Sequence, residues 1–239
     1  MKHPFRSNIL PFFTMGAAGL GFVLRLWLFS AIDEKGLLPA NHPAGVLLFL
    51  LSAIVLGILF LATRKLRPGS ISKLPRGCHM AAGLMGCIGL VLNTFLDAAS
   101  KVSGLPVVTM ILSIAGGLAL VAMGLLEFRR KKRPYWLSAI VTACLMVQTV
   151  AQCQVWGAEP QLQVYFFPLM ASIFLILAVY HKTVFLARKS NRSNLAFFSQ
   201  AAAFFCCLSF NSEHSVFYMG MFLWALLQIS LCLPRKKEG

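Results

Sequence analysis

The chain has 239 residues, of which 58 % are hydrophobic and only 12 % are charged, and its mean hydropathy is +0.76. A soluble domain carries about 25 % charged residues, because even a well-packed chain of this length needs a polar surface in water. The composition therefore excludes an ordinary soluble domain and favours an integral membrane protein, in which lipid covers the apolar surface.

The net charge is +15, from 22 Lys and Arg residues against 7 Asp and Glu residues. In a soluble protein this excess would point to nucleic acid. Here the cations occur in short clusters between apolar runs, which is the pattern of cytoplasmic loops in membrane proteins. We therefore expect no nucleic-acid partner.

The chain contains about eight apolar runs close to the length of about 20 residues that a helix needs to cross a bilayer. The sequence thus predicts an all-α, polytopic transmembrane bundle that forms a single domain over residues 1–239. The seventh run is the shortest and lies near the lower limit for a span. In chain order, the predicted spans cover residues 9–31, 44–63, 78–98, 105–128, 135–153, 162–187, 195–210 and 216–233.

Basic residues are divided very unevenly between the two sides that these spans define. One side has 19 of them, whereas the other has two, Lys35 and Lys101. Because cytoplasmic loops are enriched in Lys and Arg, the basic side and both termini are predicted to be cytoplasmic, and the compact chain suggests a bacterial cytoplasmic membrane. The basic side comprises Lys2, Arg6, Arg64, Lys65, Arg67, Lys73, Arg76, the run 129–133, Lys182, Arg188, Lys189, Arg192, Arg235, Lys236 and Lys237.

One cation, Arg25, falls inside the first predicted span, in its outer half. A charged residue at membrane depth is costly, so it is expected to face protein or water and to have a partner. Asp33, two turns further along, and Asp97, at the outer end of the third span, are the two acidic residues that could neutralise it.

Two pairs of polar residues occur at a similar depth. Asn93 and Asp97 are four residues apart in the third span, and Gln148 and Gln152 are four apart in the fifth, so each pair shares one helix face. Together with Arg25 they predict a polar pocket that opens to the outside and binds a ligand. The alternative is a structural network in which the same groups bond to one another across helices.

Small residues also recur within several of the predicted spans. They include Gly16, Gly19 and Gly21 in the first span, and further sets in the third and fourth. Because small residues allow helices to approach closely in lipid, these faces are expected to form the interior of the bundle. The further sets are Ala82, Gly86 and Gly89, and Ser113, Gly116, Gly117 and Gly124.

The outer loop after the first span contains two further ligand candidates, Asp33 and His42. Gly36, Pro39 and Pro43 predict a shaped turn around them. A histidine here could sense pH or bind a metal, although a single loop histidine more often does neither.

Signatures of catalysis are absent. The sequence has no H-E-x-x-H, G-x-S-x-G, P-loop or G-x-G-x-x-G pattern, and no histidine at mid-depth that could hold haem. The seven cysteines form no C-x-x-C pair, so they are expected to pack as small apolar residues. These observations argue against an enzyme and predict no catalytic residue, metal or cofactor.

The favoured function is a small-solute transporter, or the substrate-binding subunit of a permease that works with a partner subunit. In size and basicity the chain resembles the compact solute-binding permease subunits of bacteria, but its number of spans differs, so no residue role is taken from them. The alternatives are a membrane scaffold or regulatory subunit that docks a cytoplasmic partner through its basic loops, and an intramembrane enzyme acting on lipid. The basic loop from Arg129 to Arg133 could also bind anionic lipid headgroups.

Overall fold

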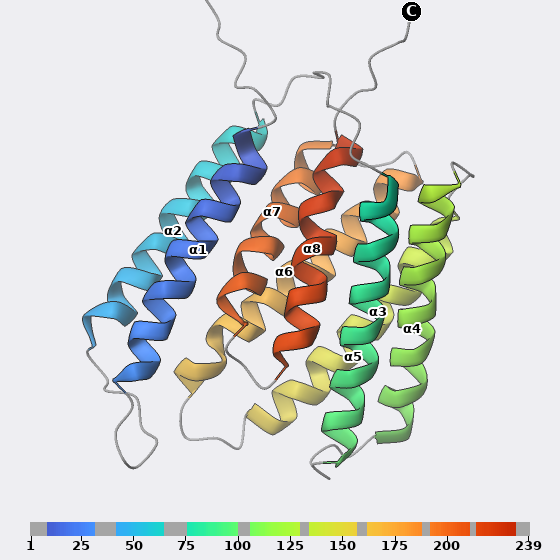
Figure 1. Ribbon diagram of the computed structural model, residues 1–239, viewed down its shortest axis with the longest axis horizontal. Helices are drawn as coiled ribbons and strands as arrows, with labels where there is room; N and C mark the ends of the chain where they lie inside the picture. Colours follow the sequence, from blue (N-terminus) through green and yellow to red (C-terminus); the bar gives the residue numbers. More distant parts are fainter. Residues whose placement is uncertain are drawn as a thin grey trace, which may run out of the picture.

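The structure of the chain, a computed structural model, describes residues 9–31, 42–64, 76–99, 106–129, 134–156, 162–187, 192–210 and 214–232. Within these ranges the regular structure consists of eight α-helices and no strand (Figure 1). A chain in lipid has no water to bond its backbone, and a helix satisfies these groups internally. The prediction of an all-helical fold is therefore confirmed.

Each helix lies within a few residues of a predicted apolar run. Even the seventh run, the shortest, forms a helix. The helices are α1 Ile9–Ser30, α2 Pro43–Arg64, α3 Arg76–Ala99, α4 Pro106–Phe128, α5 Tyr135–Trp156, α6 Leu162–Leu186, α7 Arg192–Leu208 and α8 Ser215–Cys232.

Five of these helices, α1, α2, α4, α5 and α6, are long and apolar enough to cross a membrane. In α3, α7 and α8 the apolar segments within the described residues are shorter. Large apolar side chains such as Phe12, Leu61 and Ile111 are exposed on the outer faces of the bundle. Exposing so much apolar surface is unfavourable in water but favourable in lipid, so the fold is compatible with an integral membrane protein.

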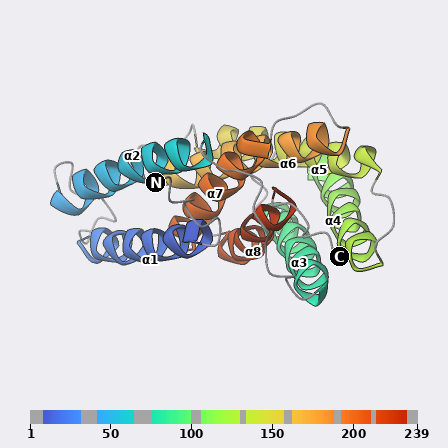
Figure 2. The same ribbon diagram turned by 90° about the horizontal axis from the view of Figure 1, so that it is seen from above.

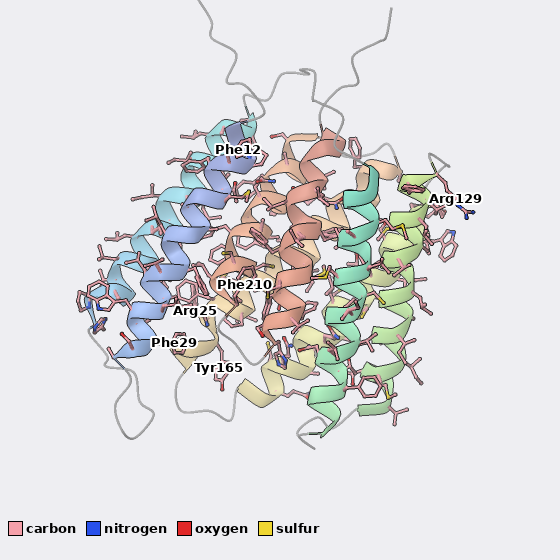
Figure 3. All side chains as sticks on the ribbon, in the orientation of Figure 1. Phe12, Arg25, Phe29, Arg129, Tyr165 and Phe210 are labelled. Atoms are coloured by element: carbon pink, nitrogen blue, oxygen red, sulfur yellow. The ribbon has the colours of Figure 1, made fainter. Side chains whose placement is uncertain are left out.

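The helices run alternately up and down, so that the start of α1 and the end of α8 lie at the same end of the bundle (Figure 1). Arg129 lies at this end and Tyr165 at the other, and we call them the Arg129 end and the Tyr165 end (Figure 3). Helices begin or end with Arg64, Arg76 and Arg192 at the Arg129 end. No described helix begins or ends with Lys or Arg at the Tyr165 end. The described termini thus carry the same charge asymmetry as the sequence.

Six helices, α3 to α8, form a closed circuit. Each packs against the next along the chain, and α8 packs back against α3. The hairpin of α1 and α2 lies outside this circuit, on one side of it, and packs against α7 (Figure 2). The molecule therefore has two parts, a six-helix circuit and an attached two-helix hairpin.

Helix α7 joins these two parts and is buried along most of its length. All residues from Ala201 to Ser209 are buried. Aromatic rings line its contacts: Phe205 stacks on Phe174 of α6 with the ring centroids 5.2 Å apart, and Phe197 meets Phe60 of α2 at 5.8 Å. The second half of α7 is therefore enclosed by protein.

Glycines allow the closest approach between helices of the circuit. A Cβ atom added to Gly220 of α8 would lie 2.5 Å from the Met85 carbonyl oxygen of α3, and one added to Gly89 would lie 2.7 Å from the Phe217 Cα. Because these neighbours are backbone atoms, only glycine fits at either position. The close packing of α3 on α8 thus depends on residues without a side chain.

The prediction that small residues face the interior is confirmed for α3 and α4 and for Gly21 of α1, which are buried. It is wrong for Gly16 and Gly19, which are exposed and have no atom within 4 Å of an added Cβ. The reason is that α1 lies at the edge of the molecule, so only one of its faces contacts protein.

Lys182, which the sequence analysis counts among the cations of the basic side, does not lie in a loop. Helix α6 continues to Leu186, and Lys182 lies inside it with only 1 % of its surface exposed. Its position four residues before the helix end placed it among the loop cations in the sequence, although its side chain is enclosed by the protein.

Candidate functional site

The structure divides the predicted pocket between the two parts of the molecule. Arg25 belongs to α1, which packs against α2 and α7, whereas Asn93, Gln148 and Gln152 belong to α3 and α5 of the circuit. Arg25 is therefore not brought together with the other predicted ligands. Asp97 lies in α3, but its side chain is outside the described residues, as is the whole of Asp33.

Within the circuit, Gln148 links three helices. Its Nε2 atom donates to the Ser113 Oγ of α4 at 2.8 Å and lies 3.3 Å from the Thr94 Oγ1 of α3. Both hydroxyls donate their own protons to carbonyls of their helices, Ser113 to Thr109 and Thr94 to Leu90. Each hydroxyl oxygen is thus left as an acceptor facing α5, which explains why a buried amide is stable there.

Asn93, next to Thr94, has no such partners. Its side chain is 1 % exposed, yet neither its amide nitrogen nor its amide oxygen makes a hydrogen bond. Leaving a buried polar group unsatisfied costs about 1–3 kcal/mol, and an unsatisfied group in a native protein calls for an explanation such as a bound water or ligand.

The direction of Asn93 follows from Gly86, which lies seven residues earlier and therefore on the same helix face. A Cβ added to Gly86 would touch both Leu120 of α4, at 3.2 Å, and Met221 of α8, at 3.4 Å. This face thus points between α4 and α8, toward the interior of the circuit. Gln148 and Gln152 lie on the buried face of α5. We call Asn93, Thr94, Ser113, Gln148 and Gln152 the amide cluster.

Tyr218 of α8 adds a further polar group to the same half of the circuit. It is fully buried, and its hydroxyl donates to the Pro168 carbonyl of α6 at 3.3 Å and lies 3.4 Å from the Ser172 Oγ. The half of the circuit nearer the Tyr165 end thus has buried polar side chains from α3, α4, α5, α6 and α8. Sequence reasoning missed Tyr218 and Ser172, because isolated Tyr and Ser residues are common in transmembrane helices and carry no pattern.

Arg25 has a different environment, which involves the end of α7. Its Nη1 atom donates to the Leu208 carbonyl, and its guanidinium lies over the rings of Phe29 at 5.3 Å and Phe167 at 5.5 Å (Figure 3). Leu208 is the last residue of α7, so its carbonyl has no partner within the helix.

The other terminal carbonyls of α7 are satisfied locally. The Ser209 N–H donates to the Phe205 and Cys206 carbonyls at 3.1 and 3.0 Å, and the Phe210 N–H donates to Cys207 at 3.2 Å. Arg25 therefore completes the cap of α7, where the negative end of the helix dipole favours a cation. This contact joins residues 183 positions apart and supports a structural role for Arg25. Neutralisation by Asp33 or Asp97 stays a prediction.

His42 also has a local structural role. Its Nδ1 atom accepts a hydrogen bond from the Ala44 N–H at 3.3 Å, directly before Pro43 begins α2, and its ring meets Trp27 edge-on at 5.4 Å. This geometry is that of a helix N-cap, and proline is favoured at the first helical position. Among the described residues, no group of His, Cys, Asp or Glu is placed to hold a metal ion.

The basic loop of the scaffold hypothesis lies largely outside the described residues. Arg129 is exposed at the end of the bundle, but residues 130–133 are not described. Binding of lipid headgroups or of a cytoplasmic partner there stays a prediction.

Comparison with known proteins identifies no relative. No protein family matches the chain, and neither the curated proteins nor the solved structures gave a match. The site is therefore characterised by its own geometry alone.

Proposed function

We propose that this protein is a small-solute transporter, or the substrate-binding subunit of a permease, and that the solute binds at the amide cluster. The observation that carries the proposal is the Asn93 amide, which is buried without any hydrogen bond. Such a group lowers stability, and a polar solute bound beside the satisfied amide of Gln148 would supply the missing hydrogen bonds.

The chemistry of the cluster favours a solute with hydroxyl or amide groups. The Asn93 side chain offers two N–H donors and one carbonyl acceptor, whereas Gln148 is held in place by Ser113 and Thr94. Arg25 is not assigned to the amide cluster, because it caps α7 and its helix packs against α2 and α7 and not against α3 or α5. A permanent guanidinium is thus not part of the proposed recognition.

The proposal includes a direction across the membrane. The described helix termini at the Arg129 end carry the arginines, so we assign this end to the cytoplasm and the Tyr165 end to the outside of the cell membrane. The amide cluster, which involves the last turns of α3 and α5, would then be reached from outside. Eight membrane crossings follow from the same assignment.

The test compares Asn93→Leu with wild type in lipid nanodiscs, using thermal unfolding in the presence of a panel of small polyols, amides and amino acids. We expect at least one solute to raise the unfolding temperature of wild type and to have no effect on Asn93→Leu. The matched control is Asn194→Leu, which changes an exposed amide on α7 and should respond like wild type.

Two results would contradict the proposal. The first is a wild-type protein whose unfolding temperature no solute of the panel changes. The second is an Asn93→Leu variant that responds to a solute as strongly as wild type does.

A further inference from the structure

A second buried polar group, Lys182, lies in the half of the circuit nearer the Arg129 end. It is ten residues beyond Ser172 on α6, which corresponds to about 15 Å along the helix. Its side chain is 1 % exposed, although an ammonium group normally reaches water whenever it can. A cation enclosed at this depth in a transmembrane helix is a candidate functional group.

The burial pattern of α6 shows that Lys182 faces the interior of the circuit. Ala171, Leu175, Ala178 and Lys182 follow one another at helical spacing, and none is more than 1 % exposed. The opposite face includes Tyr180, which is 50 % exposed. Since the neighbours of α6 within the circuit are α5 and α7, the fully buried face between them points inward.

Two residues of α8 accompany the lysine. The Lys182 Nζ atom lies 5.0 Å from the centre of the Trp224 ring, which stabilises the cation through its π face. Gln228, one turn further along α8, is 1 % exposed, and its Nε2 atom donates to the Trp224 carbonyl at 2.8 Å. The ammonium group is thus held by protein on the α8 side instead of extending to the bundle end.

An apolar layer separates Lys182 from the amide cluster. It contains Leu175 and Ala178 of α6, Met221 of α8, Leu145 of α5 and Leu90 of α3, which are all buried. Along these four helices, therefore, uncharged polar groups come first from the Tyr165 end, then apolar side chains, and then a single described cation.

We infer that Lys182 forms an anion-selective subsite of the circuit, and that the solute is a small monoanion, a carboxylate that also carries hydroxyl or amide groups. This inference rests on the proposed function and names its substrate class. A fixed cation in a medium of low dielectric constant attracts an anion and repels a cation much more strongly than it would in water. Fixed positive groups exclude cations from membrane pores in the same way. The two levels are too far apart for one small solute to contact both at once, so the amide cluster would bind the hydroxyl or amide groups of the solute first, and Lys182 would bind its carboxylate further along the circuit.

The experiment uses three probes with the same carbon skeleton and hydroxyl group but different charge: lactate, lactamide and 1-amino-2-propanol. Binding to the full-length protein in nanodiscs is measured by titration calorimetry. For wild type we expect lactate to bind about tenfold more tightly than lactamide, the gain from one charge-assisted contact, and 1-amino-2-propanol not to bind.

Three variants test whether Lys182 causes the preference for lactate over lactamide. Lys182→Met should reduce the affinity for lactate about tenfold, to that for lactamide, and leave lactamide binding unchanged. Lys182→Arg should retain the preference for lactate, which also serves if the methionine variant does not fold. Arg64→Met, which removes an exposed cation at the same end, should behave like wild type.

The outcomes separate the inference from the proposed function. Equal binding of lactate and lactamide to wild type, an unchanged preference for lactate in Lys182→Met, or its loss in Lys182→Arg would overturn the anion subsite but leave the amide cluster as a neutral-solute site. Asn93→Leu should lose lactamide binding and keep lactate binding at Lys182, and loss of lactate binding as well would overturn a separate anion subsite. If no probe binds to wild type, the anion subsite is overturned, and the proposed function is then judged by its own panel of solutes.

Discussion

The α1–α2 hairpin and the α3–α8 circuit are held together by different kinds of helix contact. In the apolar segments of α1 and α2, 28 % of the residues are buried, against 44 % in α4, α5 and α6. The circuit is closed by glycine contacts between backbones, whereas the hairpin is attached mainly through α7, by the Arg25 cap and by aromatic contacts such as that of Phe60 with Phe197. The circuit is therefore the more buried part, and the hairpin is attached to it by a small, identifiable set of contacts.

The largest effect is expected from breaking the circuit at Gly220. A methyl group in Gly220→Ala would lie 2.5 Å from a backbone oxygen of α3, and a backbone atom cannot move aside as a side chain can. We expect the free energy of unfolding in mixed micelles to fall by about 3 kcal/mol. The matched control is Gly57→Ala in α2, where the added methyl meets nothing within 4 Å, and it should leave stability unchanged or raise it by up to about 1 kcal/mol, because alanine favours the helix. Equal effects at the two positions would show that glycine packing does not distinguish the circuit from the hairpin.

The next largest loss of stability is expected from weakening the attachment of the hairpin to α7. Arg25→Met removes the cap of the Leu208 carbonyl and leaves this carbonyl unsatisfied within the protein. We expect a loss of about 2 kcal/mol in stability. Hydrogen exchange followed by mass spectrometry should locate the loss of protection in α1, α2 and the last turn of α7. If α3, α4 and α5 lose protection to the same degree, Arg25 is not specific to the hairpin.

Replacing two buried glutamines should change stability by smaller amounts and in opposite directions. Gln148→Leu removes hydrogen bonds to Ser113 and Thr94 and should lower the free energy of unfolding by about 1 kcal/mol. Gln200 of α7 is fully buried and neither of its amide atoms is bonded, so Gln200→Leu should raise stability by about 1 kcal/mol. Chemical unfolding of both variants checks this difference, and a decrease of similar size for both would mean that Gln200 has partners in solution.

The helices could be predicted well from the sequence because the length of an apolar run is a local property. The amides of the cluster were also indicated, since pairs four residues apart share a helix face. The partner of Arg25 could not be predicted, because it is a backbone carbonyl of α7, and a backbone carbonyl has no residue-type signature. Lys182 was misplaced for a related reason: a lysine near a helix end resembles a loop lysine until the packing of α8 against it is known.

The reactivity of a cysteine at Asn93 is the sharpest test of the proposed solute site. In a variant whose native cysteines are replaced by serine, Asn93→Cys would be compared with Leu92→Cys, since Leu92 is its neighbour on α3 and is 44 % exposed on the outer surface of the bundle. We predict that a small, membrane-impermeant thiol reagent added outside modifies Asn93→Cys, because a solute would reach the proposed site from the Tyr165 end. Leu92→Cys should stay unmodified, because it faces lipid. Modification of Leu92→Cys with no reaction at Asn93→Cys would contradict both the membrane orientation and the solute site.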